Sequence, residues 1–154
     1  MDRVLILNGS NLNLLGVREP DLYGTGTLAD IEATCRTEAP RLGMEIDFRQ
    51  SNHEGVLVDW MHEALKDLSG VVINAGAYAR TSLALLDAVK AVKSPVIEVH
   101  MTNIYQRESY RPASYLSYGA VGVVSGFGAY VYPMGMMALR RVLDERRAAP
   151  VTRP

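Results

Sequence analysis

The sequence predicts an α/β domain built on a parallel β-sheet with helices on both faces. Short apolar runs alternate regularly with longer segments that have the apolar spacing of helices. Two of the runs, Val71–Ile73 and Val121–Val124, are continuously apolar, as is typical of strands buried on both faces. The 154 residues contain no repeat and no internal linker. We therefore expect one domain over residues 1–145 and a disordered tail over residues 146–154.

Five segments have the composition of strands. Each is short, largely apolar and followed by polar or turn-forming residues, which favours a strand over a helix. In chain order the predicted strands are Arg3–Asn8, Met44–Gln50, Gly70–Asn74, Pro95–His100 and Ala120–Ser125.

Helical patterns fill the gaps between these strands. Thr27 is a suitable N-cap for the first helix, and Gly43 lies just beyond its end. Proline is tolerated in the first turn, so the last helix is expected to begin near Pro133, and four arginines toward its end suit a helix C-terminus. The three earlier predicted helices are Leu28–Arg41, Glu54–Leu68 and Thr81–Val92.

Composition excludes several classes of function. The chain is 48% hydrophobic and carries a net charge of −1 without a basic cluster, which argues against nucleic-acid binding. No apolar run approaches the length of about 18 residues that a membrane span needs. The single cysteine, Cys35, cannot form an internal disulfide, and we expect it to fill the core. With no leader-like start, these features predict a cytoplasmic protein.

Polar residues gather directly after the predicted strands. The first strand is followed by the polar stretch Asn8–Gly24, and loops of that length in compact domains usually close over or bind a ligand. The later loops carry Gln50–Glu54, Asn74–Ser82 and His100–Asn103, followed by Arg107 and Arg111. The carboxyl ends of parallel strands share one edge of the sheet, which is where such folds bind ligands. The sequence therefore predicts an active site at that edge, and the domain is expected to be catalytic.

The residue types in these loops limit the chemistry. The three histidines, His53, His62 and His100, lack the spacing of a zinc site. No phosphate-binding P-loop and no Gly-x-Ser-x-Gly motif occurs. We therefore expect no metal site and no phosphate-cradling loop. The remaining tyrosine, histidine, arginines and amides suit proton transfer and recognition of a small anion.

Three residues suggest a β-elimination. A tyrosine is a poor base at neutral pH, but a nearby guanidinium favours the phenolate. Arg18 lies five residues before Tyr23, with Pro20 turning the chain between them. His100, at a strand end, could protonate a leaving group on the opposite side of a small anionic substrate.

The same residues carry a family resemblance. Leu7–Gly16, Arg18–Pro20 and Tyr23–Gly24 closely resemble the opening of type II 3-dehydroquinate dehydratases. The likeness extends to about Leu143 through Arg49–Gly55, Asp59–Trp60, Thr81–Leu85, Pro95–His100, Arg107–Glu108 and Ser114–Tyr115. It implies a flavodoxin-like three-layer fold with strand order 2-1-3-4-5. It also implies a dodecamer of four trimers.

The resemblance further implies a hydro-lyase that converts 3-dehydroquinate to 3-dehydroshikimate. Water would leave by anti elimination through an enolate, without metal or cofactor. Tyr23 would be the base, with Arg18 lowering its pKa and Arg107 nearby. His100 would be the general acid, oriented by Glu98.

The other implied residues act on the substrate. Asn11 would help to hold the water that stabilises the enolate. Asn74 and the backbone amides of Met101 and Thr102 would bind the carboxylate. Arg111 would bind ring hydroxyls, and Asp87 would reach in from a neighbouring subunit.

Several positions depart from the family pattern. Ser10 replaces a usual proline, Tyr105 a common histidine and Pro112–Ala113 a basic pair, while Tyr130–Pro133 looks longer than usual. The departure with most effect on the substrate is Arg80, where the family typically has a histidine that contacts a substrate hydroxyl. Arg80 falls at the expected N-terminus of the third helix, where the helix dipole slightly disfavours a cation.

Other interpretations stay open. Asn8, Asn11 and Asn13 would also suit Asx turns, and His100 with Glu98 would suit a structural pair. A related dehydratase of specialised metabolism, acting on a modified dehydroquinate-like substrate, would keep the proton-transfer residues and change the hydroxyl contacts. A binding or scaffold protein without activity would be expected to lose the tyrosine, histidine or arginine, which are all present. Aromatic biosynthesis through the shikimate pathway and quinate breakdown both contain the implied step.

Overall fold

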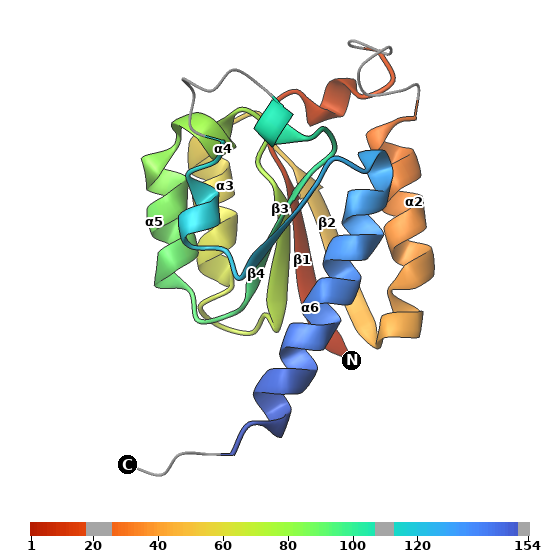
Figure 1. Ribbon diagram of the computed structural model, residues 1–154, viewed down its shortest axis with the longest axis vertical. Helices are drawn as coiled ribbons and strands as arrows, with labels where there is room; N and C mark the ends of the chain where they lie inside the picture. The colour runs from red at the N-terminus through yellow and green to blue at the C-terminus, as the bar shows by residue number, and fades with distance from the viewer. Residues whose placement is uncertain (18–25, 107–112, 151–154) are drawn as a thin grey trace.

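The computed structural model describes residues 1–17, 26–106 and 113–150. Its centre is a sheet of five parallel strands in the order β2-β1-β3-β4-β5 (Figure 1). The strands are β1 Asp2–Asn8, β2 Met44–Gln50, β3 Gly70–Asn74, β4 Val96–His100 and β5 Gly122–Ser125. This order confirms the flavodoxin-like topology, and the second and third predicted strands have their observed bounds.

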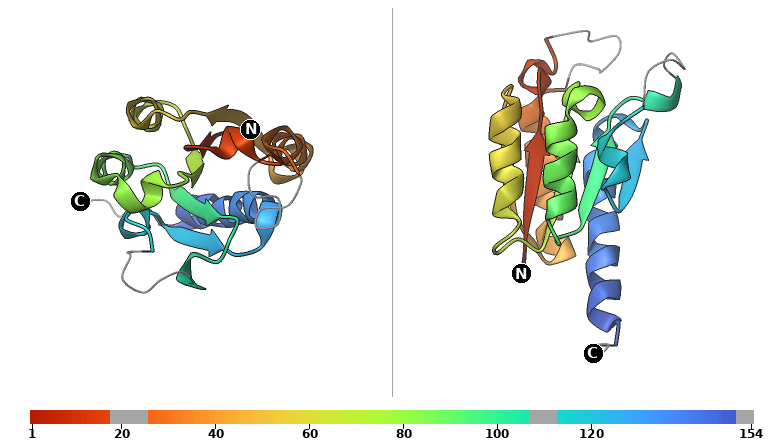
Figure 2. Two further views of the ribbon diagram at one scale, coloured as in Figure 1. Left: turned by 90° about the horizontal axis from the view of Figure 1, so that it is seen from above. Right: turned by 90° about the vertical axis from the view of Figure 1, so that its left-hand side faces the viewer.

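Helices cover both faces of the sheet, as seen from above in Figure 2. The helices are α2 Leu28–Glu38, α3 Glu54–Glu63, α4 Tyr78–Thr81, α5 Leu83–Ala91 and α6 Val131–Ala148. Alternate residues of the strands contribute to two cores. Val4 and Ile6 pack in the core beneath α2 and α6, whereas Leu5 and Leu7 pack in the core beneath α3 and α5. This alternation follows from the two-residue period of a strand.

Local sequence explains where α2 begins and ends. Thr27 caps α2 in a capping box, in which its hydroxyl accepts from Asp30 N and the Asp30 carboxylate accepts from Thr27 N. The helix was expected to reach Arg41, but it ends at Glu38. Pro40, which has no N–H to donate, opens a separate 3₁₀ turn.

The third predicted helix, Thr81–Val92, corresponds to α5, and a separate short helix, α4, precedes it and ends at Thr81. Ser82 is extended, with φ −95° and ψ 98°, and its buried hydroxyl accepts a hydrogen bond from Leu85 N. This N-cap starts α5 and separates it from the short α4. Arg80 is therefore the third residue of α4, and the expectation that it lies at the start of a longer helix was wrong.

Two further helix boundaries differ from those expected. The second predicted helix ends at Glu63 instead of Leu68, because the next three residues bond to the third residue before them, as in a 3₁₀ turn. The last helix continues through residues 146–148, which were expected to be disordered. An ion pair between Arg147 and the buried carboxylate of Asp2 fixes this end of α6 against the first strand. Residues 151–154 lie outside the described residues.

Candidate active site

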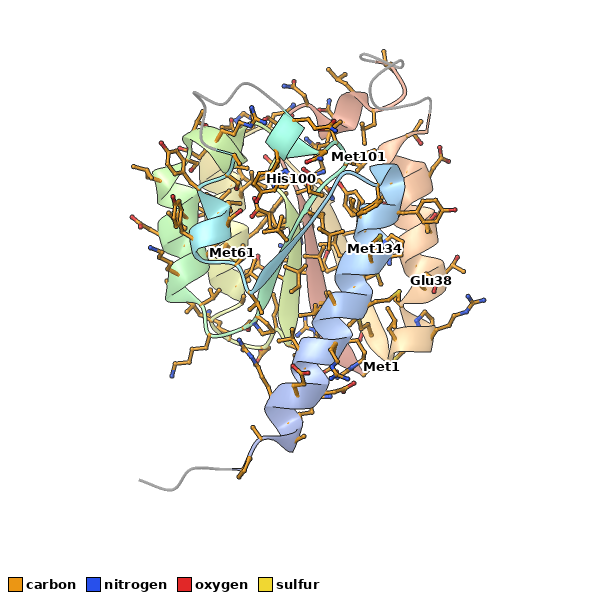
Figure 3. The ribbon with its side chains drawn as sticks, viewed as in Figure 1. Met1, Glu38, Met61, His100, Met101 and Met134 are labelled. Atoms are coloured by element: carbon orange, nitrogen blue, oxygen red, sulfur yellow. The ribbon has the colours of Figure 1, made fainter. Side chains whose placement is uncertain are left out.

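A cavity of about 250 Å³ lies at the carboxyl ends of the central strands, in the position expected from the topology. It lies where the loops after β1, β3 and β4 meet, and Figure 3 shows His100 and Met101 at this end of the sheet. Six residues singled out from the sequence line it: Asn11, Asn74, Arg80, His100, Met101 and Thr102.

The remaining predicted site residues lie elsewhere. Glu98 is fully buried behind His100 rather than on the cavity wall. Asp87 is exposed on α5 and does not line the cavity of its own chain. The four other predicted residues lie outside the described residues: Arg18, Tyr23, Arg107 and Arg111.

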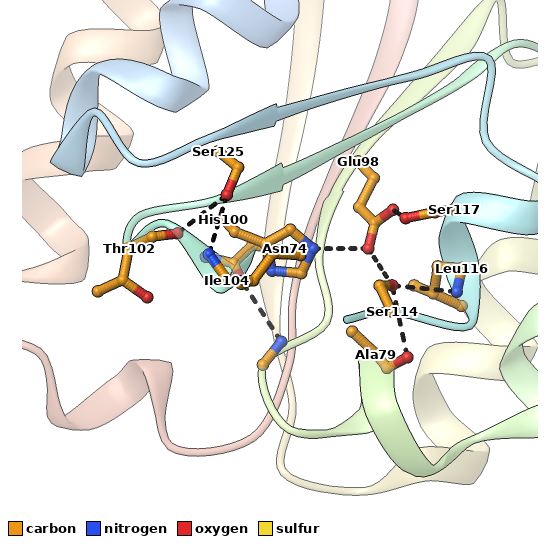
Figure 4. Close-up of polar contacts among 11 residues, drawn as sticks. Asn74, Ala79, Glu98, His100, Thr102, Ile104, Ser114, Leu116, Ser117 and Ser125 are labelled. Carbon is orange, nitrogen blue, oxygen red and sulfur yellow. Dashed lines mark hydrogen bonds and ion pairs between the residues drawn. The ribbon is translucent and has the colours of Figure 1, made fainter. Parts of the chain in front are cut away.

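Glu98 and His100 form a buried pair at the end of β4. The Oε1 atom of Glu98 lies 2.6 Å from Nε2 of His100 (Figure 4). Ser114 donates a hydrogen bond to the same carboxylate oxygen. Ser117 donates to the other oxygen, Oε2, at 2.6 Å. Each carboxylate oxygen therefore has a donor, as a buried charge requires.

This arrangement keeps the carboxylate ionised and sets the histidine ring. Burial would raise the pKa of Glu98, but the hydrogen bonds from His100, Ser114 and Ser117 outweigh it and lower the pKa. An ionised carboxylate can only accept, so Glu98 accepts the Nε2 proton of His100. Nδ1 is then the ring nitrogen through which His100 can exchange a proton with a ligand.

Asn74 is held by a buried chain of hydrogen bonds. Its Nδ2 donates to the hydroxyl of Tyr132 at 3.0 Å, and that hydroxyl donates to Oδ1 of Asn8 at 2.6 Å. Asn8 Nδ2 in turn donates to the backbone carbonyl of Arg49. Tyr132 and Asn8 are fully buried, and burial raises the pKa of Tyr132, so its hydroxyl stays protonated.

The loop after β5 orients the backbone after β4. Gly126 N donates to the carbonyl of His100, and Gly128 N donates to the carbonyl of Met101. A trans peptide points its N–H opposite to its carbonyl, and no described peptide is cis. The N–H groups of Met101 and Thr102 therefore point away from β5, toward the side of β4 where the cavity lies. Gly126 has a φ of +101°, a conformation that favours glycine.

The backbones of two loops touch beneath the cavity. A Cβ at Gly9, just after β1, would lie 2.0 Å from the carbonyl oxygen of Ala75, just after β3. The next residue but one, Asn11, has a left-handed φ of 66°. Its N–H donates to Oδ1 of Asn52, and the same oxygen accepts from Gln50. These contacts fix the start of the long loop.

Sequence reasoning missed the residues that support the site from behind. Ser117 carried no motif, and Ser114 entered only as part of the family pattern. Tyr132 entered only as part of Tyr130–Pro133, a segment that looked longer than is usual in the family, just before the expected start of the last helix. Their roles depend on contacts with Glu98 and Asn74, which are 16 to 58 residues away in sequence.

Among the described residues, no three His, Cys, Asp or Glu side chains form a group that could hold a metal ion. Within the same ranges, no helix combines the length and apolar character needed to cross a bilayer.

Comparisons with known proteins agree with one another. A family model described as dehydroquinase class II matches residues 2–140. The 3-dehydroquinate dehydratase 1 of Agrobacterium fabrum is 52% identical over 139 residues, covering 90% of this chain and 96% of that relative. The 3-dehydroquinate dehydratase of Dinoroseobacter shibae is 52% identical over 151 residues, covering 98% and 99%. The crystal structure of type II dehydroquinase from Propionibacterium acnes matches with a TM-score of 0.87 at 36% identity, covering 92% and 97%.

Proposed function

The chain belongs to the class II dehydroquinase family, and on this premise we propose that it eliminates water from 3-dehydroquinate to give 3-dehydroshikimate. It is a hydro-lyase. The observation that carries the mechanism is the buried His100–Glu98 pair at the wall of the cavity. A histidine held by a buried carboxylate, beside a cavity of substrate size, suits a general acid.

The proposed reaction is an anti elimination in two proton transfers. Tyr23 removes a proton from the carbon next to the ketone, and the electron pair of that C–H bond forms an enolate. The enolate then collapses and expels the β-hydroxyl, which takes a proton from His100 and leaves as water. Arg18 and Arg107 favour the phenolate of Tyr23, since a cation beside a phenol lowers its pKa. The steps balance without a metal or cofactor.

The cavity residues are proposed to bind the rest of the substrate. The second Nδ2 hydrogen of Asn74 and the N–H groups of Met101 and Thr102 suit a carboxylate. Asn11, with a water, would stabilise the enolate oxygen. Arg111 and Arg80 would contact ring hydroxyls.

Assembly is part of the proposal. We infer a dodecamer of four trimers in which Asp87, exposed on α5, completes a neighbour's site. Exposed apolar side chains along the edge strand β5 and into α6 support a subunit interface: Val123, Phe127, Tyr130, Met134 and Met137. We place the enzyme in the cytoplasm, where a lone buried thiol such as Cys35 stays reduced. Light scattering that gives the mass of a monomer would contradict the assembly.

One direct experiment tests the activity and its base. Purified enzyme is mixed with 3-dehydroquinate, and the rise in enone absorbance is followed with and without a chelator. We expect turnover that the chelator leaves unchanged. Tyr23→Phe should lower kcat by about 10²–10⁴-fold, the usual contribution of a general base. A variant that keeps most of its turnover would exclude Tyr23 as the base.

A second candidate substrate is favoured by one observation. Arg80 lines the cavity, and arginine offers five hydrogen-bond donors with a permanent charge. A related dehydratase acting on a modified dehydroquinate-like substrate would use such a group against a hydroxyl or an anionic substituent. Its cation would oppose an ammonium group, so an amino analogue should be a poor substrate. Comparing kcat/KM for 3-dehydroquinate and such analogues separates the two candidates.

A further inference from the structure

We propose that Tyr132 is a positioning residue for substrate binding: its buried hydroxyl fixes which way the Asn74 amide faces. The hydroxyl lies on α6, outside the cavity lining, and reaches the site only through Asn74. The identity of the ligand rests on the proposed function, whereas the hydrogen-bond chain itself does not.

Backbone groups at both ends set the donor-to-acceptor direction of the hydrogen-bond chain that links Asn74, Tyr132 and Asn8. At one end, the carbonyl of Arg49 can only accept, so Asn8 must present Nδ2 to it and Oδ1 to Tyr132. At the other end, Gly76 N can only donate, and it lies 3.3 Å from Oδ1 of Asn74. Neither backbone group can reverse its role. The single hydroxyl hydrogen of Tyr132 therefore goes to Asn8, and its lone pair accepts from Asn74 Nδ2.

A flipped Asn74 would break this pattern at two places. Its Nδ2 would face Gly76 N, donor against donor, and its Oδ1 would compete with Asn8 for the one hydroxyl hydrogen. Buried polar groups without partners are costly. The Tyr132 hydroxyl thus fixes the Asn74 amide so that one Nδ2 hydrogen is donated to this hydroxyl. The other Nδ2 hydrogen then faces the carboxylate of the substrate. Tyr132 acts on binding without touching the ligand.

Tyr132→Phe removes the hydroxyl and keeps the ring, which packs near Phe48. We expect KM for 3-dehydroquinate to rise roughly tenfold, since a hydrogen bond to a charged group would be weakened. The carboxylate is remote from the bonds that break, so kcat should change much less. Met136→Ala, one turn along the same buried face of α6, is the matched control. It should lower stability to urea without changing KM.

A double-mutant cycle makes the test specific. If Tyr132 acts through Asn74, Tyr132→Phe should have no further effect on KM in an Asn74→Ala background. An unchanged KM in the single variant, or an equal rise in both backgrounds, would overturn the proposal. Wild-type enzyme without turnover of 3-dehydroquinate would instead refute the proposed function.

A measurement on the unmutated protein covers the case in which Tyr132→Phe does not fold. The exchange of the two side-chain amide protons of Asn74 with solvent water is followed by nuclear magnetic resonance. The measurement needs no ligand. One of the two protons should be protected and should show a through-bond coupling or contact to the Tyr132 hydroxyl. Equal, rapid exchange of both protons would overturn the proposal.

Discussion

Glu98→Gln tests how much the reaction depends on the charge behind His100. The substitution keeps the size and shape of a fully buried side chain. It replaces the acceptor 2.6 Å from His100 Nε2 with an uncharged amide. A glutamine carries no charge to balance a protonated imidazole, so the acid form of His100 loses stabilisation.

The magnitude follows from the kind of bond that is lost. Hydrogen bonds to charged groups contribute about 1.5–3 kcal/mol, and each 1.36 kcal/mol corresponds to about tenfold in rate. We therefore expect kcat to fall by about 10- to 150-fold, with a much smaller change in KM. Ser117→Ala removes a donor at 2.6 Å from Glu98 Oε2 but leaves the carboxylate and its contact with His100 in place. It should therefore lower kcat by less than about tenfold, or about 1.36 kcal/mol.

The assay is steady-state turnover of 3-dehydroquinate, with a matched carboxylate substitution as control. Glu63→Gln removes the charge of a half-exposed residue of α3 that pairs with Arg49 away from the cavity. Its kcat should equal that of the wild type. A Glu98→Gln enzyme with kcat within twofold of the wild type would refute the assigned role of the buried carboxylate.

Three further predictions concern the contact between the loops after β1 and β3, the pH dependence of stability, and the choice of substrate. Gly9→Ala should abolish activity and destabilise the fold by roughly 1–3 kcal/mol or more, because its Cβ would lie 2.0 Å from Ala75 O. Gly26→Ala is the control, since a Cβ at Gly26 meets nothing within 4 Å. Equal urea midpoints for the two variants would contradict this prediction. Hydrogen bonds from Arg147 and Arg140 of α6 hold the pKa of Asp2 below its ordinary value despite burial. The ionised Asp2 therefore adds to the free energy of unfolding above about pH 4, and this contribution is lost as the pH falls below that value. The urea midpoint of Asp2→Asn should therefore fall less than that of the wild type between pH 5 and pH 3, roughly the range that brackets an ordinary carboxyl pKa, and parallel curves would contradict it. Arg80→His should raise kcat/KM for 3-dehydroquinate if the natural substrate differs from it, and a fall would show that Arg80 is adapted to 3-dehydroquinate.

The sequence predicted all five strands because strand signals are local and continuous, but one of them was expected to be buried on both faces and is not. That strand, β5, was predicted over Ala120–Ser125. It spans Gly122–Ser125 at the edge of the sheet, and Val121 and Val123 are exposed. Val71–Ile73 is apolar throughout and bounded by Gly70 and Asn74, so both ends of β3 were evident. The strand order came from the family resemblance, since periodicity does not encode which strands pair. Helix ends were less predictable: Ser82 divides α4 from α5 through one buried side-chain bond, and apolar spacing cannot reveal such a bond.

For the site, the sequence predicted six residues that line the cavity but not the contacts that hold them. His100 and Asn74 are the last residues of β4 and β3, and the carboxyl ends of these neighbouring parallel strands share an edge of the sheet. Topology alone therefore brings them together. Ser117 and Tyr132 come from segments with no such constraint. They reach Glu98 and Asn74 only through tertiary packing, and no spacing rule in the chain connects them.

The role of His100 is tested by comparing turnover of 3-dehydroquinate by the wild type and by His100→Ala. We propose that the enzyme eliminates water from 3-dehydroquinate bound in the cavity at the ends of β1, β3 and β4, with His100 as the general acid. We expect the wild type to form 3-dehydroshikimate and the variant to lose about 10²–10⁴-fold in kcat, with an unchanged circular dichroism spectrum. A folded His100→Ala enzyme that still forms the product at the wild-type rate would contradict this proposal.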